Sequence, residues 1–268
     1  MSSLETSSSQ ALREFAEHPG RYLALDESGK IARHLSDRMC VVVAPTFAVV
    51  TSIDATDADL PSLLDEVRGL IPAGVKTNWY LGPSMRPESL PEKLVALGLR
   101  EPEDDSGLLH ALLLDHEPTG VPDHIETHEI ATMSDFAGAA EVRWEAFQLS
   151  EELREHERGF LATYYEAHLQ TKDRSTMSIV ATIDGRVAGT ASALLSDRGL
   201  FLIGGSTAPW ARRRGVYRAL VGARWRYAVE RGTPALTVHA IHNTSSPVLR
   251  GMGFEEVCSI RNLEGEPT

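Results

Sequence analysis

The sequence has only two cysteines among its 268 residues, Cys40 and Cys258, and they lie far apart. Two such cysteines provide neither a disulfide framework nor a cysteine-rich zinc site. No apolar run approaches the ~20 residues that cross a bilayer. The first nine residues are polar and lack the basic and then apolar pattern of a signal peptide. These absences predict a soluble, cytoplasmic protein without a metal site.

Basic residues are also scarce, because 26 Lys and Arg stand against 38 Asp and Glu, a net charge of −12. Residues 1–125 hold 10 basic and 20 acidic side chains, a net −10, whereas residues 126–268 hold 16 and 18, a net −2. An acidic first half either attracts a cationic partner or keeps the protein in solution. Domains that bind nucleic acid usually carry a basic face, so the composition argues against that partner.

Length and composition divide the chain into two domains. A chain of 268 residues with 42% hydrophobic content is comfortable for two folded cores. Residues 117–125 are rich in proline, glycine and polar side chains, which predicts a linker. We therefore expect an N-terminal domain over 1–116 and a C-terminal domain over 126–268.

Hydrophobic periodicity predicts alternating strands and helices in both domains. In the first, we expect strands over 39–43, 47–53, 78–81 and 108–114, with helices over 57–70 and 87–97. In the second, we expect strands over 126–131, 178–183, 186–195, 200–207 and 236–240, and helices over 134–148, 151–169, 216–231 and 246–252. Ser134 and Asp135 are the expected helix caps, and Asp184-Gly185 is a strong hairpin turn. This order predicts an α/β (α+β) fold, a mixed central sheet with flanking helices.

A short segment after the predicted strand 200–207 carries the clearest functional signal. It contains three consecutive arginines at 212–214, followed by Gly215 and then by the helical pattern 216–231. This order gathers backbone N–H groups at the positive end of a helix dipole, where a phosphate or pyrophosphate binds well. Gly215 lets the main chain approach an anion closely. The segment therefore predicts a site for a phosphorylated cofactor.

Three consecutive arginines also occur at solvated helix ends and in surfaces that bind nucleic acid. The acidic composition disfavours the nucleic-acid alternative. A dinucleotide site requires three glycines at fixed positions, whereas residues 214–217 supply one. The sequence contains no Gly-Lys-Ser or Gly-Lys-Thr, which excludes a Walker loop. A solvated helix end stays as the alternative to an anion-binding turn.

Two motifs resemble the GCN5-related N-acetyltransferase (GNAT) superfamily. Residues 209–217 resemble its Arg/Gln-x-x-Gly-x-Gly/Ala signature. Residues 243–254 resemble the Asn-x-x-Ser…Leu-x-x-x-Gly-Phe motif at the end of the same fold. The likeness covers roughly residues 126–262 and is more specific than either motif alone, because the expected strand and helix lie between them. The N-terminal half resembles a degraded copy of this fold without the arginine and glycine array. The expectation is two tandem GNAT-like domains, of which the second binds the cofactor.

The resemblance implies that acetyl-CoA is the co-substrate, with its pyrophosphate in the arginine turn. It implies that strands 200–207 and 236–240 splay apart and hold the pantetheine arm. The residues implied to bind acetyl-CoA are Gly205, Ser206, Thr207, Arg212, Arg213, Arg214, Gly215, Val216, Tyr217, Asn243 and Ser246. Gly204 and Gly205 fit either a backbone that approaches a ligand or a β-bulge. Asn243 and Ser246 fit helix caps equally well.

The sequence departs from the family pattern at two positions. Tyr217 stands where the signature has glycine or alanine, and Leu249 stands where the family often has the tyrosine that protonates the departing thiolate. The resemblance therefore leaves the general acid to another group or to bulk water.

Two residues are candidates for the general base. Glu145 lies on the helix that lines the acceptor groove in the family, although a solvated helix residue would look the same. His239 lies on the second splayed strand and has a suitable intrinsic pKa, although a strand histidine is also a common structural residue. Tyr164, Tyr165 and His168 have helical spacing and form either a wall of the acceptor site or part of the core.

The resemblance implies an acetyl-CoA-dependent N-acetyltransferase that moves an acetyl group directly to an amine of a small molecule or peptide. The leucine at 249 leaves a second hypothesis, a non-catalytic acyl-CoA-binding module that regulates or scaffolds. Beyond the amine acceptor we expect no nucleic-acid partner and no membrane partner. The protein is expected to be a monomer or a homodimer.

Overall fold

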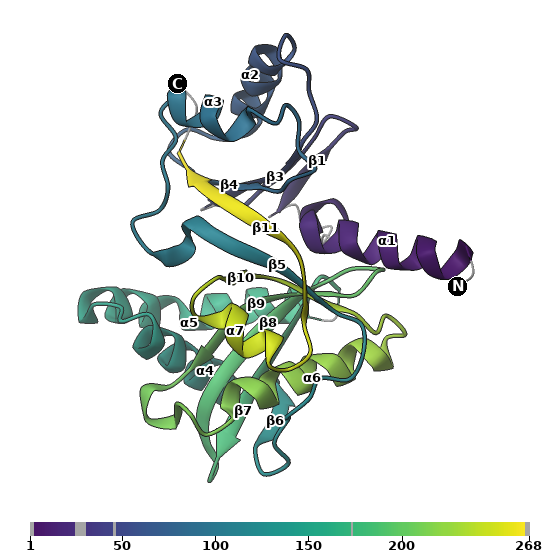
Figure 1. Ribbon diagram of the computed structural model, residues 1–268. Coiled ribbons are helices and arrows are strands. Elements are labelled where there is room, and N and C mark those ends of the chain that lie inside the picture. The colour runs from purple at the N-terminus through teal and green to yellow at the C-terminus, as the bar shows by residue number, and fades with distance from the viewer. Residues whose placement is uncertain (1–2, 25–30, 45–46, 173, 266–268) are drawn as a thin grey trace. The chain divides into compact units, whose positions relative to one another are not determined.

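The computed structural model describes residues 3–24, 31–44, 47–172 and 174–265 (Figure 1). The chain forms two compact units, of which unit 1 combines residues 1–113 with 237–268 and unit 2 comprises residues 114–236. Residues 237–268, which the sequence groups with the C-terminal domain, thus lie in unit 1. No helix among the described residues is both long and apolar enough to cross a membrane.

Unit 1 contains a seven-stranded mixed sheet in the order β1-β2-β3-β4-β11-β5-β10. Its strands are β1 (Ala32–Leu35), β2 (Met39–Val43), β3 (Phe47–Ile53), β4 (Lys76–Leu81), β5 (Leu108–Leu114), β10 (Leu236–Ile241) and β11 (Glu255–Glu264). Its helices are α1 (Ser3–Glu17), α2 (Leu60–Leu70), α3 (Leu90–Ala96) and α7 (Ser245–Arg250), with short 3-10 turns at Pro19–Arg21 and Asp105–Gly107. The apolar periodicity of α2 places Leu60, Leu63, Leu64 and Val67 in the core around the fully buried Trp79.

The middle of this sheet is completed by β11, which follows unit 2 in the sequence. β11 pairs antiparallel with β4 on one side and with β5 on the other, and Figure 1 shows it lying between them. Ile260 and Leu263 of β11 are fully buried. The sequence patterns predicted neither β11 nor α1 nor β1.

The last residue of α1 and the residue after it bond to groups in β3 and just after β4. The parallel pairing joins Phe47–Val50 to Lys76–Trp79, starts at the first residue of both strands and stops before either strand ends. Beyond it, His18 bonds through Nδ1 to the carbonyl oxygen of Thr51 at 2.6 Å and through Nε2 to Ser84 Oγ at 2.6 Å. The backbone N–H of Ser84 donates to Glu17 Oε1 at 2.8 Å. Side chains of this segment therefore satisfy polar groups that the strands leave unpaired.

Unit 2 contains a four-stranded antiparallel sheet in the order β9-β8-β7-β6. Its strands are β6 (Glu126–Glu129), β7 (Thr176–Ile183), β8 (Arg186–Leu195) and β9 (Leu200–Thr207), and its helices are α4 (Met133–Ala146), α5 (Glu151–Thr171) and α6 (Val216–Glu230), with a 3-10 turn at Pro209–Ala211. Helices α4 and α6 both contact β8 and β9. Buried residues occupy consecutive positions along β7 and β8, which indicates cover on both faces of the sheet.

The prediction of a mixed sheet with flanking helices is confirmed, and the hairpin at Asp184-Gly185 joins β7 to β8 as expected. The expected cap of α4 at Ser134 was wrong. Thr132 is the cap, since its side chain accepts from the backbone N–H of Asp135 at 3.1 Å, and the Asp135 carboxylate accepts from the N–H of Thr132 at 3.1 Å. This reciprocal capping box satisfies two helix-end donors, which one serine cannot do.

Candidate active site

The arginine turn contains two residues with left-handed backbone. After the 3-10 turn at Pro209–Ala211, Arg213 has φ +61° and Gly215 has φ +88°. Gly215 is the N-cap of α6, and left-handed backbone is the conformation in which glycine is favoured. A Cβ at Gly215 would lie 3.1 Å from Pro122 Cγ, so the position also lacks room for a side chain.

The start of α6 is prepared for an anion. No side chain caps the N-terminus of this helix, and its first turn contains no acidic residue. The first N–H groups of a helix need partners from outside the helix, and together with the helix dipole they attract negative charge. Arg212, Arg213 and Arg214 are exposed around them. These features are compatible with a phosphate at the turn, and the phosphate site stays a prediction.

A β-bulge lies in β9 just before this turn. The register between β8 and β9 shifts so that Thr190 faces Ser206 whereas Ser192 faces Ile203. Gly204 has φ +61°, and Gly204 and Gly205 are both exposed. The bulge interpretation of these glycines is thus confirmed, and a bulge leaves main-chain groups outside the ladder. Ser206 is buried and Thr207 is half-buried.

Tyr217, the departure from the family signature, packs against this bulge. A Cβ at Gly205 would lie 2.8 Å from the Tyr217 ring, so the glycine makes room for the aromatic side chain. The pKa of Tyr217 is raised, mainly by burial, although the positive charge of Arg224 acts in the opposite direction. The large residue on the helix and the small residue on the strand are therefore complementary. Val216, next to Tyr217, is buried against Gly189 of β8.

The segment predicted as a linker packs along α6. A Cβ at Gly222 would lie 2.6 Å from Val121, and a Cβ at Gly120 would lie 2.5 Å from the Arg218 guanidinium. Pro122 lies against Gly215. This part of 117–125 therefore supports the first turns of α6 within unit 2.

His239 lies in unit 1, in a structural environment. Its Nε2 lies 3.0 Å from the carbonyl oxygen of Ala16 at the end of α1, and its ring meets Tyr80 edge to face at 5.5 Å between centroids. Burial is the main cause that lowers the pKa of His239 from 6.5 to about 4. The imidazole is therefore neutral near pH 7, with Nε2 placed to donate to that carbonyl. A role for His239 as general base stays a prediction.

Ser246 and Asn243 also lie in unit 1, at the short helix α7. Ser246 is 1% exposed, and its Oγ lies 2.9 Å from His110 Nδ1. His110 Nδ1 in turn lies 3.5 Å from Glu256 Oε2. Asn243 is exposed, and the N-cap of α7 is Thr244, which makes no side-chain cap bond. The alternative that Asn243 or Ser246 is the cap of this helix is thus wrong. His110 was not a sequence candidate, because it lies in the domain expected to lack a site.

Glu145 is partly exposed near the end of α4 in unit 2. The predicted aromatic cluster on α5 divides into two. Tyr165 donates from its hydroxyl to the carbonyl oxygen of Ala131 at 2.8 Å, and its ring packs on Phe136, as does that of His168. Tyr164 is 46% exposed. Tyr165 and His168 thus belong to the packing of unit 2, and Tyr164 is the one of the three that solvent reaches most.

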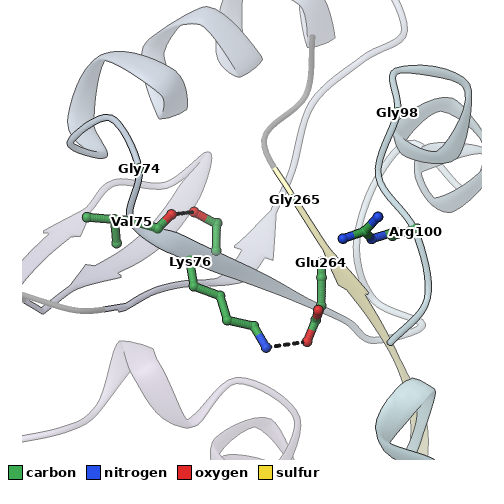
Figure 2. Close-up of a pocket in the computed structure, with 8 residues that line it drawn as sticks. Gly74, Val75, Lys76, Gly98, Arg100, Glu264 and Gly265 are labelled. Carbon is green, nitrogen blue, oxygen red and sulfur yellow. Dashed lines mark hydrogen bonds and ion pairs between the residues drawn. The ribbon is translucent and has the colours of Figure 1, made fainter. Parts of the chain in front are cut away.

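A separate depression of about 600 Å³ lies in unit 1, at the start of β4 and the end of β11 (Figure 2). Lys76 Nζ and Glu264 Oε1 form an ion pair at 2.7 Å on its wall, and Arg100 stands opposite. None of the residues predicted for the site lines it. The arginine turn of unit 2 therefore remains the better candidate.

The geometry of the turn predicts that backbone groups matter more for binding than the arginine side chains. Replacing Arg212 and Arg214 together with glutamine should weaken binding of CoA by about tenfold at low salt, because both guanidiniums are exposed and screened by water. Isothermal calorimetry at two salt concentrations will measure this. If this double variant lost CoA affinity as completely as a variant with an altered turn backbone, the backbone groups would not be the main binding groups. Steep, salt-dependent binding of DNA or RNA by the native protein would favour the nucleic-acid alternative.

Comparison with known protein families identifies part of the chain. Residues 136–254 match the model of the acetyltransferase (GNAT) family. This region is a GNAT domain. The match includes α4, the bulged strand β9, the arginine turn and α6, and it ends at Phe254. The matched region supports acyltransferase activity of the GNAT type. No curated protein sequence matches the chain significantly.

Solved structures with the GNAT fold resemble the whole chain. A GCN5-related N-acetyltransferase from Kribbella flavida superposes with a TM-score of 0.63 at 14% identity, covering 96% of each chain. One from Sphaerobacter thermophilus has a TM-score of 0.55 at 18% identity, covering 95% of this chain and 93% of that one. A tandem GNAT protein from the clavulanic acid biosynthesis pathway has a TM-score of 0.58 at 11% identity, covering 98% and 96%. At such identities the likeness concerns the fold alone.

Proposed function

We propose that this GNAT protein transfers an acetyl group from acetyl-CoA to an amine of a small molecule or a peptide. The observation that carries the proposal is the start of α6, with left-handed Arg213 and Gly215, uncapped N–H groups and no acidic residue in the first turn. A pyrophosphate supplies the negative charge and the hydrogen-bond acceptors that the N–H groups at the start of α6 need.

The residues of unit 2 fit acetyl-CoA in two further ways. The bulge at Gly204 and Gly205 provides main-chain groups outside the ladder, which suit the amide groups of a pantetheine arm. A Cβ at Gly215 would crowd Pro122, so glycine is favoured at this turn. When bound, acetyl-CoA supplies an activated thioester carbonyl.

The chain has three tasks in a direct transfer. The α6 amides and the bulge hold the donor in place, which lowers the entropic part of the barrier. A base removes a proton from the ammonium form of the acceptor, and we assign this role to Glu145. As the amine nitrogen bonds to the carbonyl carbon, the carbon–sulfur bond breaks and the nitrogen releases its second proton to water. The thiolate takes a proton from water, since Leu249 has no proton to give.

The reaction can be tested with the purified protein. Acetyl-CoA is incubated with a panel of polyamines, amino sugars, amino acids and peptides, and free CoA thiol is measured together with the mass of the acceptor. Thiol release that depends on the acceptor, with a mass gain of one acetyl group, supports the proposal. Acetyl-CoA binding without acyl turnover on a whole-cell metabolite extract would favour the non-catalytic module.

Glu145 gives a specific prediction within this assay. Changing Glu145 to glutamine should lower kcat by about 100-fold or more at neutral pH, because the amide cannot accept the ammonium proton. Binding of acetyl-CoA should stay unchanged. Glu141→Gln is a matched control one turn earlier, where the carboxylate is exposed and pairs with Arg158 at 3.3 Å. Equal activity of the two variants would remove Glu145 from the mechanism.

Unit 1 is proposed to be a degenerate GNAT-like copy that binds no acetyl-CoA. The support is that side chains of unit 1 itself occupy the polar groups beside the β3–β4 ladder. Glu17 and His18 bond there to Thr51 and Ser84. A Cβ at Gly82 would collide with the Glu17 carboxylate, so the filling is tight. The stoichiometry of acetyl-CoA binding, measured by calorimetry, should therefore be one per chain.

A further inference from the structure

Arg186, the first residue of β8, is an exposed cation that a neutral ring holds in place. Its guanidinium lies 4.4 Å from the ring centroid of Trp210, in the 3-10 turn that precedes the arginine turn. A cation on an aromatic face is attracted by the ring and keeps its charge. Arg186 forms no ion pair with a carboxylate of the described residues, including that of Asp184 in the adjacent hairpin turn. The guanidinium is therefore oriented but not neutralised.

The strand register places Arg186 at the end of the sheet where the arginine turn begins. β8 and β9 are antiparallel, Gly189 faces the last residue of β9, and the backbone N–H of Ala208 donates to the carbonyl oxygen of Ala188 at 2.9 Å. Residues before Gly189 therefore lie beyond the end of β9, in the direction in which this strand leads into the 3-10 turn. Along that direction the bulge at Gly204 comes first, the end of β9 second and Arg186 third.

Three further cations follow Trp210 within four residues. Arg212, Arg213 and Arg214 are exposed, and none of them forms an ion pair with a carboxylate of the described residues. The whole chain has a net charge of −12, so this part of the surface has the opposite sign to the average. Neighbouring cations repel one another, and a ligand with several negative charges relieves that repulsion.

CoA has the number and order of phosphate groups that this arrangement fits. In the proposed function the pantetheine arm lies at the bulge and the pyrophosphate at the start of α6. The nucleotide end of CoA then leaves the pyrophosphate on the side away from the bulge, and it carries a third phosphate on its ribose. This 3′-phosphate is a monoester with a charge of about −1.5 to −2 near pH 7. A planar guanidinium binds such a group through two parallel hydrogen bonds.

We propose that Arg186, oriented by Trp210, binds the ribose 3′-phosphate of CoA and makes the site select CoA over 3′-dephospho-CoA. The inference rests on the proposed function for the identity of the cofactor. Arg186 contacts the end of the cofactor that is remote from the thioester, so it determines affinity and selectivity and does not touch the reacting atoms.

The test compares two ligands that differ only in this phosphate. Calorimetry at low salt measures the affinity of the full chain for CoA and for 3′-dephospho-CoA. We expect the native protein to bind CoA about fivefold more tightly, as for one exposed ion pair with good geometry. In Arg186→Gln this ratio should fall to about one, because the variant loses the contact with the 3′-phosphate. Its affinity for 3′-dephospho-CoA should equal that of the native protein, which also shows that the variant is folded.

Two further variants separate this contact from a general effect of charge. Arg226→Gln removes an exposed cation of α6, which donates to Thr127 Oγ1 at 3.1 Å, and should leave the ratio at about five. Trp210→Leu removes the ring and keeps the cation of Arg186. It should lower the ratio to about two, because the ligand then has to order a mobile side chain.

Each outcome bears on one of the two proposals. Equal affinity of the native protein for the two ligands would overturn the inference about Arg186, as would an unchanged ratio in Arg186→Gln. A ratio that falls as far in Arg226→Gln would indicate overall charge as the cause and would overturn it too. If the native protein binds neither ligand, the proposed function fails instead.

Discussion

Replacing Gly215 with glutamate will abolish acetyl-CoA binding, with an affinity loss of about 100-fold or more. Three effects act together. The residue has φ +88°, which strains any side chain, and a Cβ there would lie 3.1 Å from Pro122 Cγ. The new carboxylate would also occupy the positive end of α6 and repel a pyrophosphate. Calorimetry with CoA and acetyl-CoA measures the loss.

Gly232, just beyond the other end of α6, provides the matched control. It has φ +73°, and a Cβ there would meet nothing within 4 Å. Gly232→Glu thus introduces the same backbone strain and the same charge away from the anion site. We expect it to cost stability, measured as a lower melting temperature, with little change in affinity. If Gly215→Glu binds acetyl-CoA as well as Gly232→Glu does, the turn is not the cofactor site.

Replacing Trp79 with alanine will lower the free energy of unfolding of unit 1 by about 3–5 kcal/mol. Trp79 is fully buried in a core built by α2, α3 and the strands β2, β3 and β4. The substitution leaves a large cavity and removes the hydrogen bond from the Trp79 indole N–H to the carbonyl oxygen of Gly265 at 3.1 Å. The shift should appear in urea titrations that are followed by far-UV circular dichroism.

Trp210 is the matched control for this change. It is half-buried, and its main contact is the Arg186 guanidinium, which lies 4.4 Å from the ring centroid. We expect Trp210→Ala to cost about 1 kcal/mol or less. Equal losses in the two variants would show that the core of unit 1 does not depend on Trp79 in the way its burial indicates.

Local features of the site were predictable from the sequence because they depend on neighbouring residues. A glycine after three arginines, between a strand pattern and a helix pattern, suffices to predict the turn at Gly215. The hairpin at Asp184-Gly185 depends in the same way on two residues. The fold class followed from the alternation of strands and helices, which is also a local pattern.

Features that depend on distant partners were not predictable from these patterns. β11 contains few adjacent apolar residues, since Glu255, Glu256 and Arg261 interrupt it, and its pairing with β4 and β5 joins segments far apart in sequence. Arg224 resembles an ordinary helix arginine until the packing of α6 on β8 shows it to be buried. The pairing of His110 with Ser246 likewise depends on the sheet of unit 1.

The placement of β11 has a consequence for how the protein is made. β4 and β5 are synthesised before unit 2, but the strand that joins them is synthesised after it. During synthesis, one edge of β4 and both edges of β5 therefore stay unpaired until unit 2 has emerged, because β10 and β11 follow it in the sequence. Exposed edges of this kind invite pairing with other chains. Aggregation during expression should accordingly depend on the speed of translation through residues 114–254.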